Sequence, residues 1–213
     1  FKNKIQLKNI SFKYNDSENL ILNKINLTIM KNDIFGISGV SGSGKTTLVN
    51  VLLGLLKPFE GKILFDSQEV DDKTLFNEMV GYVPQSSLIL DDSLLNNIIF
   101  GSFKKNVDLN WIKKCIELVK LKNFVKSLPY GINTILGEDG SKISGGQKQR
   151  IGLARALYSK PKIIVLDEAT NALDKKTELA ILKTVKELSV NTTIILISHD
   201  SKVLEICNKR FNI

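Results

Sequence analysis

Residues 39–46, GVSGSGKT, have the types and spacing of a loop that binds phosphate groups. Its glycines allow backbone N–H groups to approach the phosphates, Lys45 can reach the β- and γ-phosphates, and the Thr46 hydroxyl can bind Mg²⁺. We expect a buried strand over Ile34–Ser38 before the loop and a helix from about Thr46 to Leu56 after it. In this context a simple glycine and serine turn is a poor alternative, so the segment predicts a nucleotide site.

Two acidic residues end the apolar run IIVLDEA at 163–169. A buried parallel strand places such residues at the sheet edge where ligands bind. Asp167 is suited to the Mg²⁺ shell and Glu168 to polarising a water molecule in line with the γ-phosphate. Taken alone, an acidic pair after a strand is more often a helix cap. The phosphate loop in the same chain favours the catalytic interpretation.

Three further residues are predicted to be functional because the phosphate loop and the acidic pair lie in the same chain. Gln85 follows the strand GYVP and is predicted to bind Mg²⁺ and water, although by itself it would be an ordinary loop residue. His199, the only histidine, ends another apolar strand and is predicted to contact the γ-phosphate rather than only satisfy a local hydrogen bond. Tyr14 could stack on adenine, with an edge-strand tyrosine as the alternative.

A second anion site is predicted at residues 143–150, ISGGQKQR. Ser144 is expected to cap a long amphipathic helix whose first glycines leave the backbone open, and such a helix N-terminus attracts anions. Within one molecule this site is surplus, because the phosphate loop already surrounds a nucleotide. It makes sense if it closes over the nucleotide of another copy.

The elements that must position these residues follow from hydrophobic periodicity. Alternation over the first thirty residues predicts two half-exposed antiparallel strands. Strands alternate with helices along much of the remaining chain, which predicts an α/β fold with a mostly parallel sheet covered on both faces. Further strands are expected at 62–66, 81–85, 162–167 and 192–198, and helical segments at 91–127, 175–189 and 201–208. The stretch 86–159 interrupts the alternation as a helical subdomain.

Composition indicates a globular domain, and the low cysteine content indicates a protein of a reducing compartment. The 213 residues are 43% hydrophobic and 24% charged, and no apolar run approaches the roughly 18 residues of a membrane helix. No secretory signal is visible, and the two cysteines are expected to be core thiols. The net charge of +8 comes from scattered lysines, which favours a solvated surface over binding to nucleic acid or to an anionic membrane surface.

Together these motifs resemble the nucleotide-binding domain of ABC transporters over nearly the whole chain. The resembling segments are Tyr14 as the A-loop aromatic, 39–47 as Walker A, Gln85 as the Q-loop, 143–147 as the signature, 163–167 as Walker B, Glu168, 171–174 as the D-loop and His199 as the switch histidine. The resemblance implies a P-loop NTPase (RecA-like) core with an N-terminal antiparallel β subdomain and an inserted α-helical subdomain. It implies a single domain over 1–213, in which 1–85 and 160–213 form the core with the β subdomain and 86–159 carry the signature.

The family pattern also implies a site for ATP and Mg²⁺, shared by a head-to-tail dimer that encloses two ATP molecules. Catalysis would fall to Glu168, His199, Lys45 and Gln85, and metal binding to Thr46, Gln85 and Asp167. Nucleotide contacts would come from Tyr14, Gly39, Val40, Ser41, Gly42, Ser43, Gly44, Lys45, Thr46, Thr47, Gln85, Ser144, Gly145, Gly146, Gln147, Asp174 and His199. The signature of one copy would cap the γ-phosphate held by the other, so that ATP drives closure and hydrolysis releases it.

Residues 134–140, TILGEDG, look like the segment of exporters that touches the membrane domain. We therefore expect an ATPase domain excised from an exporter, with membrane helices upstream on the same polypeptide and the domain on the cytoplasmic face of the (inner) cell membrane. Two departures from the family pattern are Ile143 before SGGQ and Asn171 where serine is usual in the D-loop. Asn171 could adjust hydrogen bonding across the dimer.

Two alternatives stay open at this stage. A soluble ABC ATPase acting on nucleic acid or ribosomes would carry coiled coils or a second cassette, and a small-molecule P-loop kinase would have no use for SGGQ. The cargo of an exporter, whether lipid, lipid-linked oligosaccharide or peptide, cannot be read from these residues. Neither can the choice between homodimer and heterodimer.

Overall fold

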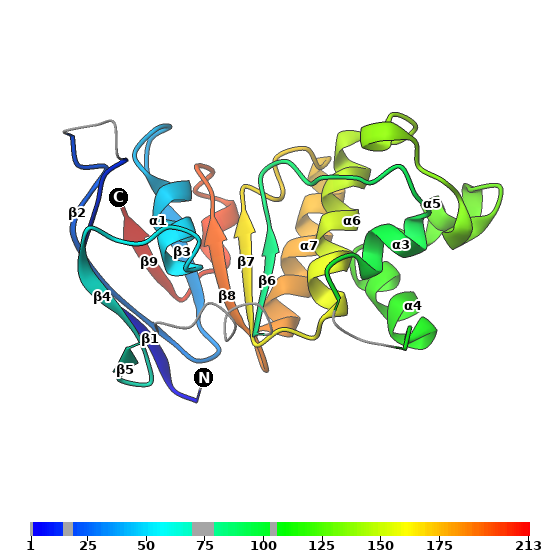
Figure 1. Cartoon of the computed structure of the whole chain (residues 1–213). Helices are drawn as coiled ribbons and strands as arrows, with labels where there is room; N and C mark the ends of the chain where they lie inside the picture. The colour runs from blue at the N-terminus through cyan, green and yellow to red at the C-terminus, as the bar shows by residue number, and fades with distance from the viewer. Residues whose placement is uncertain (1, 15–18, 70–78, 103–105) are drawn as a thin grey trace.

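The computed structural model describes residues 2–14, 19–69, 79–102 and 106–213 (Figure 1). An antiparallel sheet forms one side of the molecule, with strand order β2-β1-β4-β5. Its strands are β1 (Lys4–Phe12), β2 (Leu22–Met30), β4 (Glu60–Phe65) and β5 (Gln68–Glu69). The predicted antiparallel pairing of the first two strands is confirmed. The two-residue β5 was not predicted.

A five-stranded parallel sheet of order β6-β7-β8-β3-β9 lies in the middle of the molecule. Its strands are β3 (Ile34–Ser38), β6 (Val80–Val83), β7 (Ile163–Asp167), β8 (Thr193–Ile197) and β9 (Lys209–Asn212), all paired in parallel. Every residue of β7 and β8 is buried, as expected for parallel strands covered on both faces. Because the strands run the same way, their carboxyl ends share the upper edge in Figure 1.

Helix α1 (Lys45–Leu52) packs between the two sheets, where its apolar face shares one core with residues of β1 and β3. The opposite face of the parallel sheet is covered by α6 (Gly145–Tyr158) and α7 (Lys175–Leu188). Helices α3 (Leu94–Ile99) and α4 (Leu109–Leu118) pack against α6, and α5 (Lys122–Ser127) lies farther out, at the right in Figure 1. Short 3₁₀ turns lie at η1 (Gly131–Asn133), η2 (Glu138–Gly140) and η3 (Val203–Ile206). Across the described ranges, no helix combines the length and apolarity that a membrane crossing requires.

Several element boundaries differ from the sequence prediction. Helix α1 ends at Leu52, before the predicted Leu56, because Gly54 adopts a left-handed conformation (φ 68°). The N–H groups of Gly54 and Leu55 then donate to the carbonyls of Val51 and Asn50, which closes the helix. The described part of the predicted helical stretch 91–127, which leaves out 103–105, contains three separate helices, and the segment 201–208 contains a 3₁₀ turn.

Candidate functional site

The phosphate loop connects β3 to α1 and is shaped by glycines. Gly44, the N-cap of α1, is left-handed (φ 96°, ψ 13°), and no side chain caps the helix. A Cβ on Gly44 would lie 2.9 Å from the Ile21 side chain, so only glycine fits there. Gly42 also has a positive φ of 80°, but a Cβ on it would meet nothing within 4 Å. The loop therefore leaves open space beside Gly42.

Lys45 holds its cation against the backbone of this loop. Its Nζ donates to the carbonyls of Gly39 at 3.0 Å and Val40 at 2.8 Å, and the residue is only 7% exposed. The first N–H groups of α1 have no acceptor within the helix, and the helix dipole adds positive potential. The buried Ser43 hydroxyl also has no hydrogen-bond partner in the part of the chain that the structure describes. These donors fit a phosphate group.

The first acidic residue, Asp167, ends β7 beside this loop. Its Oδ2 accepts from the Thr46 hydroxyl at 3.2 Å and from the Tyr82 hydroxyl at 3.3 Å. Burial raises the pKa of Asp167, an effect that these hydrogen bonds only partly offset. Burial and the Asp167 carboxylate together raise the pKa of Tyr82 to about 12. Hydroxyl and carboxylate oxygens are the ligands that Mg²⁺ prefers, so Thr46 and Asp167 fit a magnesium ion next to bound phosphates.

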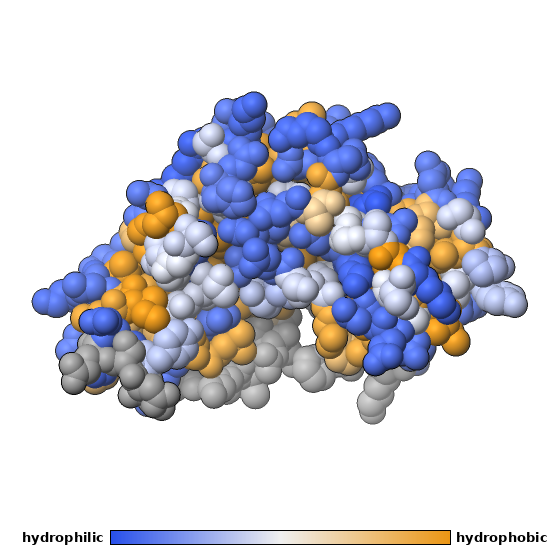
Figure 2. Space-filling view, turned by 90° about the horizontal axis from the view of Figure 1, so that it is seen from above, coloured by the Kyte–Doolittle hydropathy of each residue, from blue (hydrophilic) through white to orange (hydrophobic). Residues whose placement is uncertain are grey.

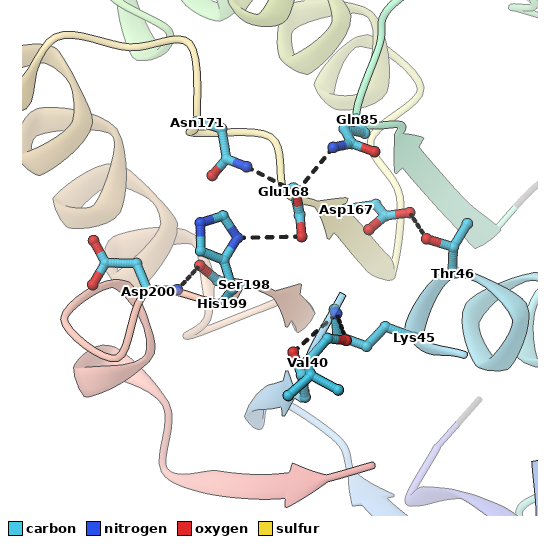
Figure 3. Close-up of polar contacts among 11 residues, drawn as sticks. Val40, Lys45, Thr46, Gln85, Asp167, Glu168, Asn171, Ser198, His199 and Asp200 are labelled. Atoms are coloured by element: carbon cyan, nitrogen blue, oxygen red, sulfur yellow. Dashed lines mark hydrogen bonds and ion pairs between the residues drawn. The ribbon is translucent and has the colours of Figure 1, made fainter. Parts of the chain in front are cut away.

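Glu168 lies at the centre of the site (Figure 3). Its Oε2 accepts from Gln85 Nε2 at 3.0 Å and from Asn171 Nδ2 at 2.8 Å, while Oε1 lies 3.4 Å from His199 Nδ1. The Glu168 side chain is 14% exposed. Its backbone is left-handed (φ 49°), and its N–H donates to the Ile197 carbonyl of β8. Residues that follow β6, β7 and β8 therefore converge on one carboxylate.

His199 reaches this cluster from the turn after β8. The Ser198 hydroxyl accepts from the Asp200 N–H at 3.0 Å, which fixes the turn, and Lys175 lies 3.9 Å from the Asp200 carboxylate. The imidazole is 62% exposed and so remains accessible to a ligand. The structure thus brings together Lys45, Thr46, Gln85, Asp167, Glu168 and His199 at one sheet edge.

Tyr14 lies in a different region, just beyond β1. Its ring packs edge-to-face on Phe12, with centroids 5.0 Å apart, and it is 46% exposed. A groove of about 650 Å³ adjoins it, lined by Phe12, Lys13, Tyr14, Leu56, Lys57 and Phe59. An exposed aromatic face beside an apolar groove can accept a planar base, but the contacts of Tyr14 recorded in the structure are with the antiparallel sheet.

The SGGQ segment forms the N-terminus of α6, as predicted. Ser144 is the N-cap: its hydroxyl accepts from the Gln147 N–H at 3.3 Å, and Gln147 Oε1 accepts from the Ser144 N–H at 2.8 Å. This reciprocal capping box fixes the helix start. A Cβ on Gly146 would approach the Ala172 carbonyl to 2.9 Å, so the helix tip lies against the loop that follows Glu168.

Some site contacts had no signal in the sequence. The side-chain Oε1 of Gln149 accepts from the Ala172 N–H at 3.1 Å, and the guanidinium of Arg155 donates to the backbone carbonyls of Asn97 and Leu88. The hydrogen bond from the Tyr82 hydroxyl to Asp167 also had no signal in the sequence. Asp174, predicted to contact nucleotide, caps α7 by accepting from the Thr177 N–H at 3.0 Å. Hydrogen bonds from the side chain and then from the backbone N–H of Thr177 lower the pKa of Asp174.

Figure 2 shows the end of the molecule that carries the carboxyl ends of the parallel strands. Hydrophilic residues cover its middle, and apolar residues gather toward the antiparallel sheet and toward the helical side. Helix α6 begins at this end in Figure 1, so both predicted anion sites face the same way. Two molecules could therefore present both sites to each other across this surface.

Known proteins are similar to this chain in sequence and in fold. The family model described as ABC transporter matches residues 22–171. The alpha-hemolysin translocation ATP-binding protein HlyB of Escherichia coli O157:H7 is 39% identical over 207 residues, covering 96% of this chain and 29% of that protein. An ATP-dependent lipid A-core flippase of Cupriavidus metallidurans is 34% identical over 200 residues, covering 92% of this chain and 34% of the flippase.

A solved structure of a bacterial Atm1-family ABC exporter with ATP bound is also similar. It superposes with a TM-score of 0.94 at 31% sequence identity, covering all of this chain (100%) and 37% of the exporter chain. The chain thus spans about a third of the length of the relatives it matches.

Proposed function

The chain belongs to the ABC transporter family, and from that premise we propose that it binds and hydrolyses Mg²⁺-ATP as the ATPase domain of an exporter. The observation that carries this proposal is the convergence of Gln85 and His199 on Glu168, beside the Thr46–Asp167 pair and the phosphate loop. These groups come from four elements of one sheet edge. This placement supports the proposal, because attack of water on a γ-phosphate needs phosphate donors, a metal site and a water-positioning group close together.

In this proposal the phosphate loop surrounds the phosphates, with Lys45 exchanging its carbonyl partners for phosphate oxygens. Thr46, Asp167 and Gln85 would hold Mg²⁺, which neutralises phosphate charge when bound. The Glu168 carboxylate accepts a proton from water as the water oxygen bonds to the γ-phosphorus and the bond to ADP breaks. His199 would contact the γ-phosphate, and Tyr14 would stack on the adenine.

The donors at the tip of α6 support a head-to-tail dimer. The capping box uses the N–H groups of Ser144 and Gln147, and the first intrahelical bond runs from the Lys148 N–H to the Ser144 carbonyl. The N–H groups of Gly145 and Gly146 then have no acceptor within the helix, and the Ser144 hydroxyl still has a hydrogen to donate. We propose that these three donors bind the γ-phosphate held by a second copy.

The proposal for the whole protein rests on the share of the relatives that the chain covers, about a third. The remaining length would include membrane helices on the same polypeptide, placing this domain on the cytoplasmic face of the (inner) cell membrane. The two named relatives differ in cargo, so their similarity to this chain favours neither. Within the chain, we propose that 1–85 with 160–213 form the nucleotide-binding core and that 86–159 form the helical subdomain.

The test compares the purified protein with its Glu168→Gln variant. We expect hydrolysis to fall by about a hundredfold or more, because glutamine cannot accept the proton. Binding of a fluorescent ATP analogue should persist, and the variant should accumulate as an ATP-bound dimer on size exclusion. Glu187→Gln, on the exposed face of α7, is the matched control. Turnover by Glu168→Gln at the wild-type rate would contradict the proposal.

Stimulation by partners separates this function from the alternative. For an exporter domain, the rate of ATP turnover should change when the domain is joined to its membrane helices in a lipid membrane. The rate should not change when RNA or ribosomes are added. ATP turnover that rises several-fold with RNA or ribosomes would instead favour a soluble ABC ATPase.

A further inference from the structure

Asn171 makes two hydrogen bonds to Glu168 within one short loop. Its Nδ2 donates to Glu168 Oε2 at 2.8 Å, and its backbone N–H donates to the Glu168 carbonyl at 3.2 Å. The side-chain bond is shorter than those from Gln85 (3.0 Å) and His199 (3.4 Å) to the same carboxylate. Figure 3 shows the amide of Asn171 pointing at Glu168 from the side opposite Lys45.

The three neighbours of this carboxylate have different attachments. Gln85 follows β6 and leads into the helical segment 86–159, while His199 follows β8. Both depend on the relative placement of separate elements. Asn171 is three residues from Glu168 on the same loop, so its amide stays close to the carboxylate when other elements shift. An amide N–H₂ is also a donor at every pH, unlike an imidazole nitrogen.

The loop itself is held on its other side by α6. The Ala172 N–H donates to Gln149 Oε1 at 3.1 Å, and Gln149 is only 6% exposed. The helix tip packs closely as well, since a Cβ on Gly146 would lie 2.9 Å from the Ala172 carbonyl. Asn171 therefore connects a loop backbone that α6 holds in place to the Glu168 carboxylate, whose orientation matters for the reaction.

We propose that Asn171 is a positioning residue that holds Glu168 Oε2, so that Oε1 stays directed toward the side where His199 lies. The inference rests on the proposed hydrolysis, because Glu168 has to be the group that accepts the proton. Loss of the amide would let the carboxylate rotate and lower the rate of the chemical step, while nucleotide binding at the phosphate loop would be unchanged.

The experiment measures kcat and KM for Mg²⁺-ATP hydrolysis in Asn171→Ala and Asn171→Asp. Asparagine and aspartate serve equally well in turns, so a purely structural role predicts that Asn171→Asp behaves like the wild type. Positioning predicts the reverse. We expect kcat to fall about tenfold in Asn171→Ala and further in Asn171→Asp, where a second carboxylate repels Glu168. KM should stay within about twofold in both.

A double-mutant cycle with Glu168→Gln supplies the second readout. If Asn171 acts through the Glu168 carboxylate, Asn171→Ala should slow residual hydrolysis no further in the Glu168→Gln background. Asn110→Ala, on the exposed face of α4, is the matched control, and thermal unfolding checks that each variant folds. Additive losses in the cycle, or wild-type kcat in both Asn171 variants, would overturn the inference.

The outcomes also separate this inference from the proposed function. If wild-type hydrolysis is abolished by Glu168→Gln but is insensitive to Asn171, only the positioning role fails. If Glu168→Gln leaves hydrolysis intact, the proposed function fails and takes this inference with it.

Discussion

The N-termini of α1 and α6 both face the same end of the molecule, yet they begin in different ways. Helix α1 starts at a left-handed glycine, Gly44, with no side-chain cap. Helix α6 starts at an extended serine, Ser144 (φ −73°, ψ 159°), within a complete capping box. Both have the backbone donors and the dipole of an anion site. At α6, the capping side chains satisfy some of the backbone N–H groups at the helix start, whereas at α1 no side chain does so.

The difference points to different dependence on ligand. At α1 the unpaired N–H groups and the Lys45 cation are satisfied best when phosphate is bound, so this end is a dedicated receptor. The capping box of α6 stabilises that helix start whether or not phosphate is near. A tip that is stable by itself can leave and return to a phosphate, which is what a dimer that opens and closes requires.

The largest effect that separates the two ends is expected for Lys45→Ala. Removing the cation from the loop should reduce ATP binding and lower hydrolysis by about 10² to 10³, the usual cost of losing a charge aimed at phosphate. Equilibrium binding of a fluorescent ATP analogue and phosphate release measure the two losses. Lys183→Ala on the exposed side of α7 is the control. If ATP affinity is unaltered in Lys45→Ala, the N-terminus of α1 is not the dedicated phosphate receptor, and it no longer differs from the tip of α6 in this respect.

At the other end, Ser144→Ala should act mainly on the dimer. Loss of the cap is expected to cost about 1 kcal/mol of unfolding free energy. Loss of a hydrogen bond to phosphate should lower hydrolysis about tenfold or more. ATP binding to the separated chain should stay within about twofold. If ATP affinity instead falls as far as in Lys45→Ala, then the tip of α6 contributes to the nucleotide site of its own chain.

A smaller effect is expected for the matched pair Gly146→Ala and Gly145→Ala. A Cβ at 146 would meet the Ala172 carbonyl at 2.9 Å, whereas a Cβ at 145 would lie 3.6 Å from the Ala172 side chain, an ordinary contact. Overpacking should make Gly146→Ala less stable by about 1 kcal/mol, while Gly145→Ala should gain slightly from its helical position. Urea unfolding compares them. Equal stability of the two variants would show that α6 does not press on the loop.

The smallest effect concerns alkaline pH and two half-buried groups on opposite faces of the parallel sheet, Cys207 on the α7 side and Tyr82 on the α1 side. Burial raises the pKa of Cys207 from 9.0 to about 11, and burial with the Asp167 carboxylate raises the pKa of Tyr82 from 10.0 to about 12. The folded chain therefore keeps these protons at pH values where the unfolded chain loses them. This stability is fully present below about pH 9 and is lost as the pH rises toward 12.

Urea unfolding between pH 8 and 11 checks the alkaline effect. The free energy of unfolding should decline with rising pH, and the decline between pH 9 and 11 should be shallower in Cys207→Ala. A decline of equal slope in that variant would contradict the assignment to the thiol.

The sequence predicted best those features that local pattern controls. Strand β3 has its predicted bounds because a short apolar run lies directly before the glycines of the phosphate loop. The cap at Ser144 followed from serine and glycine chemistry at the start of an amphipathic helix. The break between α4 and α5 could not be predicted in this way, because it depends on Lys120 in a left-handed conformation (φ 59°) that lysine rarely adopts.

Contacts between distant segments were beyond the reach of pattern alone. Tyr82 meets Asp167 because β6 pairs with β7 in the register Tyr82↔Val165, and no local signal gives that register. Gln149 reaches Ala172 only after α6 and the loop after β7 have been packed together. Asn171 was noticed as a departure from the family pattern, but its expected role lay across the dimer. The structure shows it bound to Glu168 of its own chain, and the role across the dimer stays a prediction.

The left-handed backbone of Glu168 has a consequence for how this protein can be improved. A residue with a side chain in that conformation costs on the order of 1 kcal/mol or more, and glycine avoids that cost. Any engineering campaign that ranks variants by heat resistance alone would therefore favour glycine at this position and discard the carboxylate. At position 168, a substitution that raises thermal stability is therefore expected to lower the rate of ATP hydrolysis, so both quantities have to be measured when such variants are chosen.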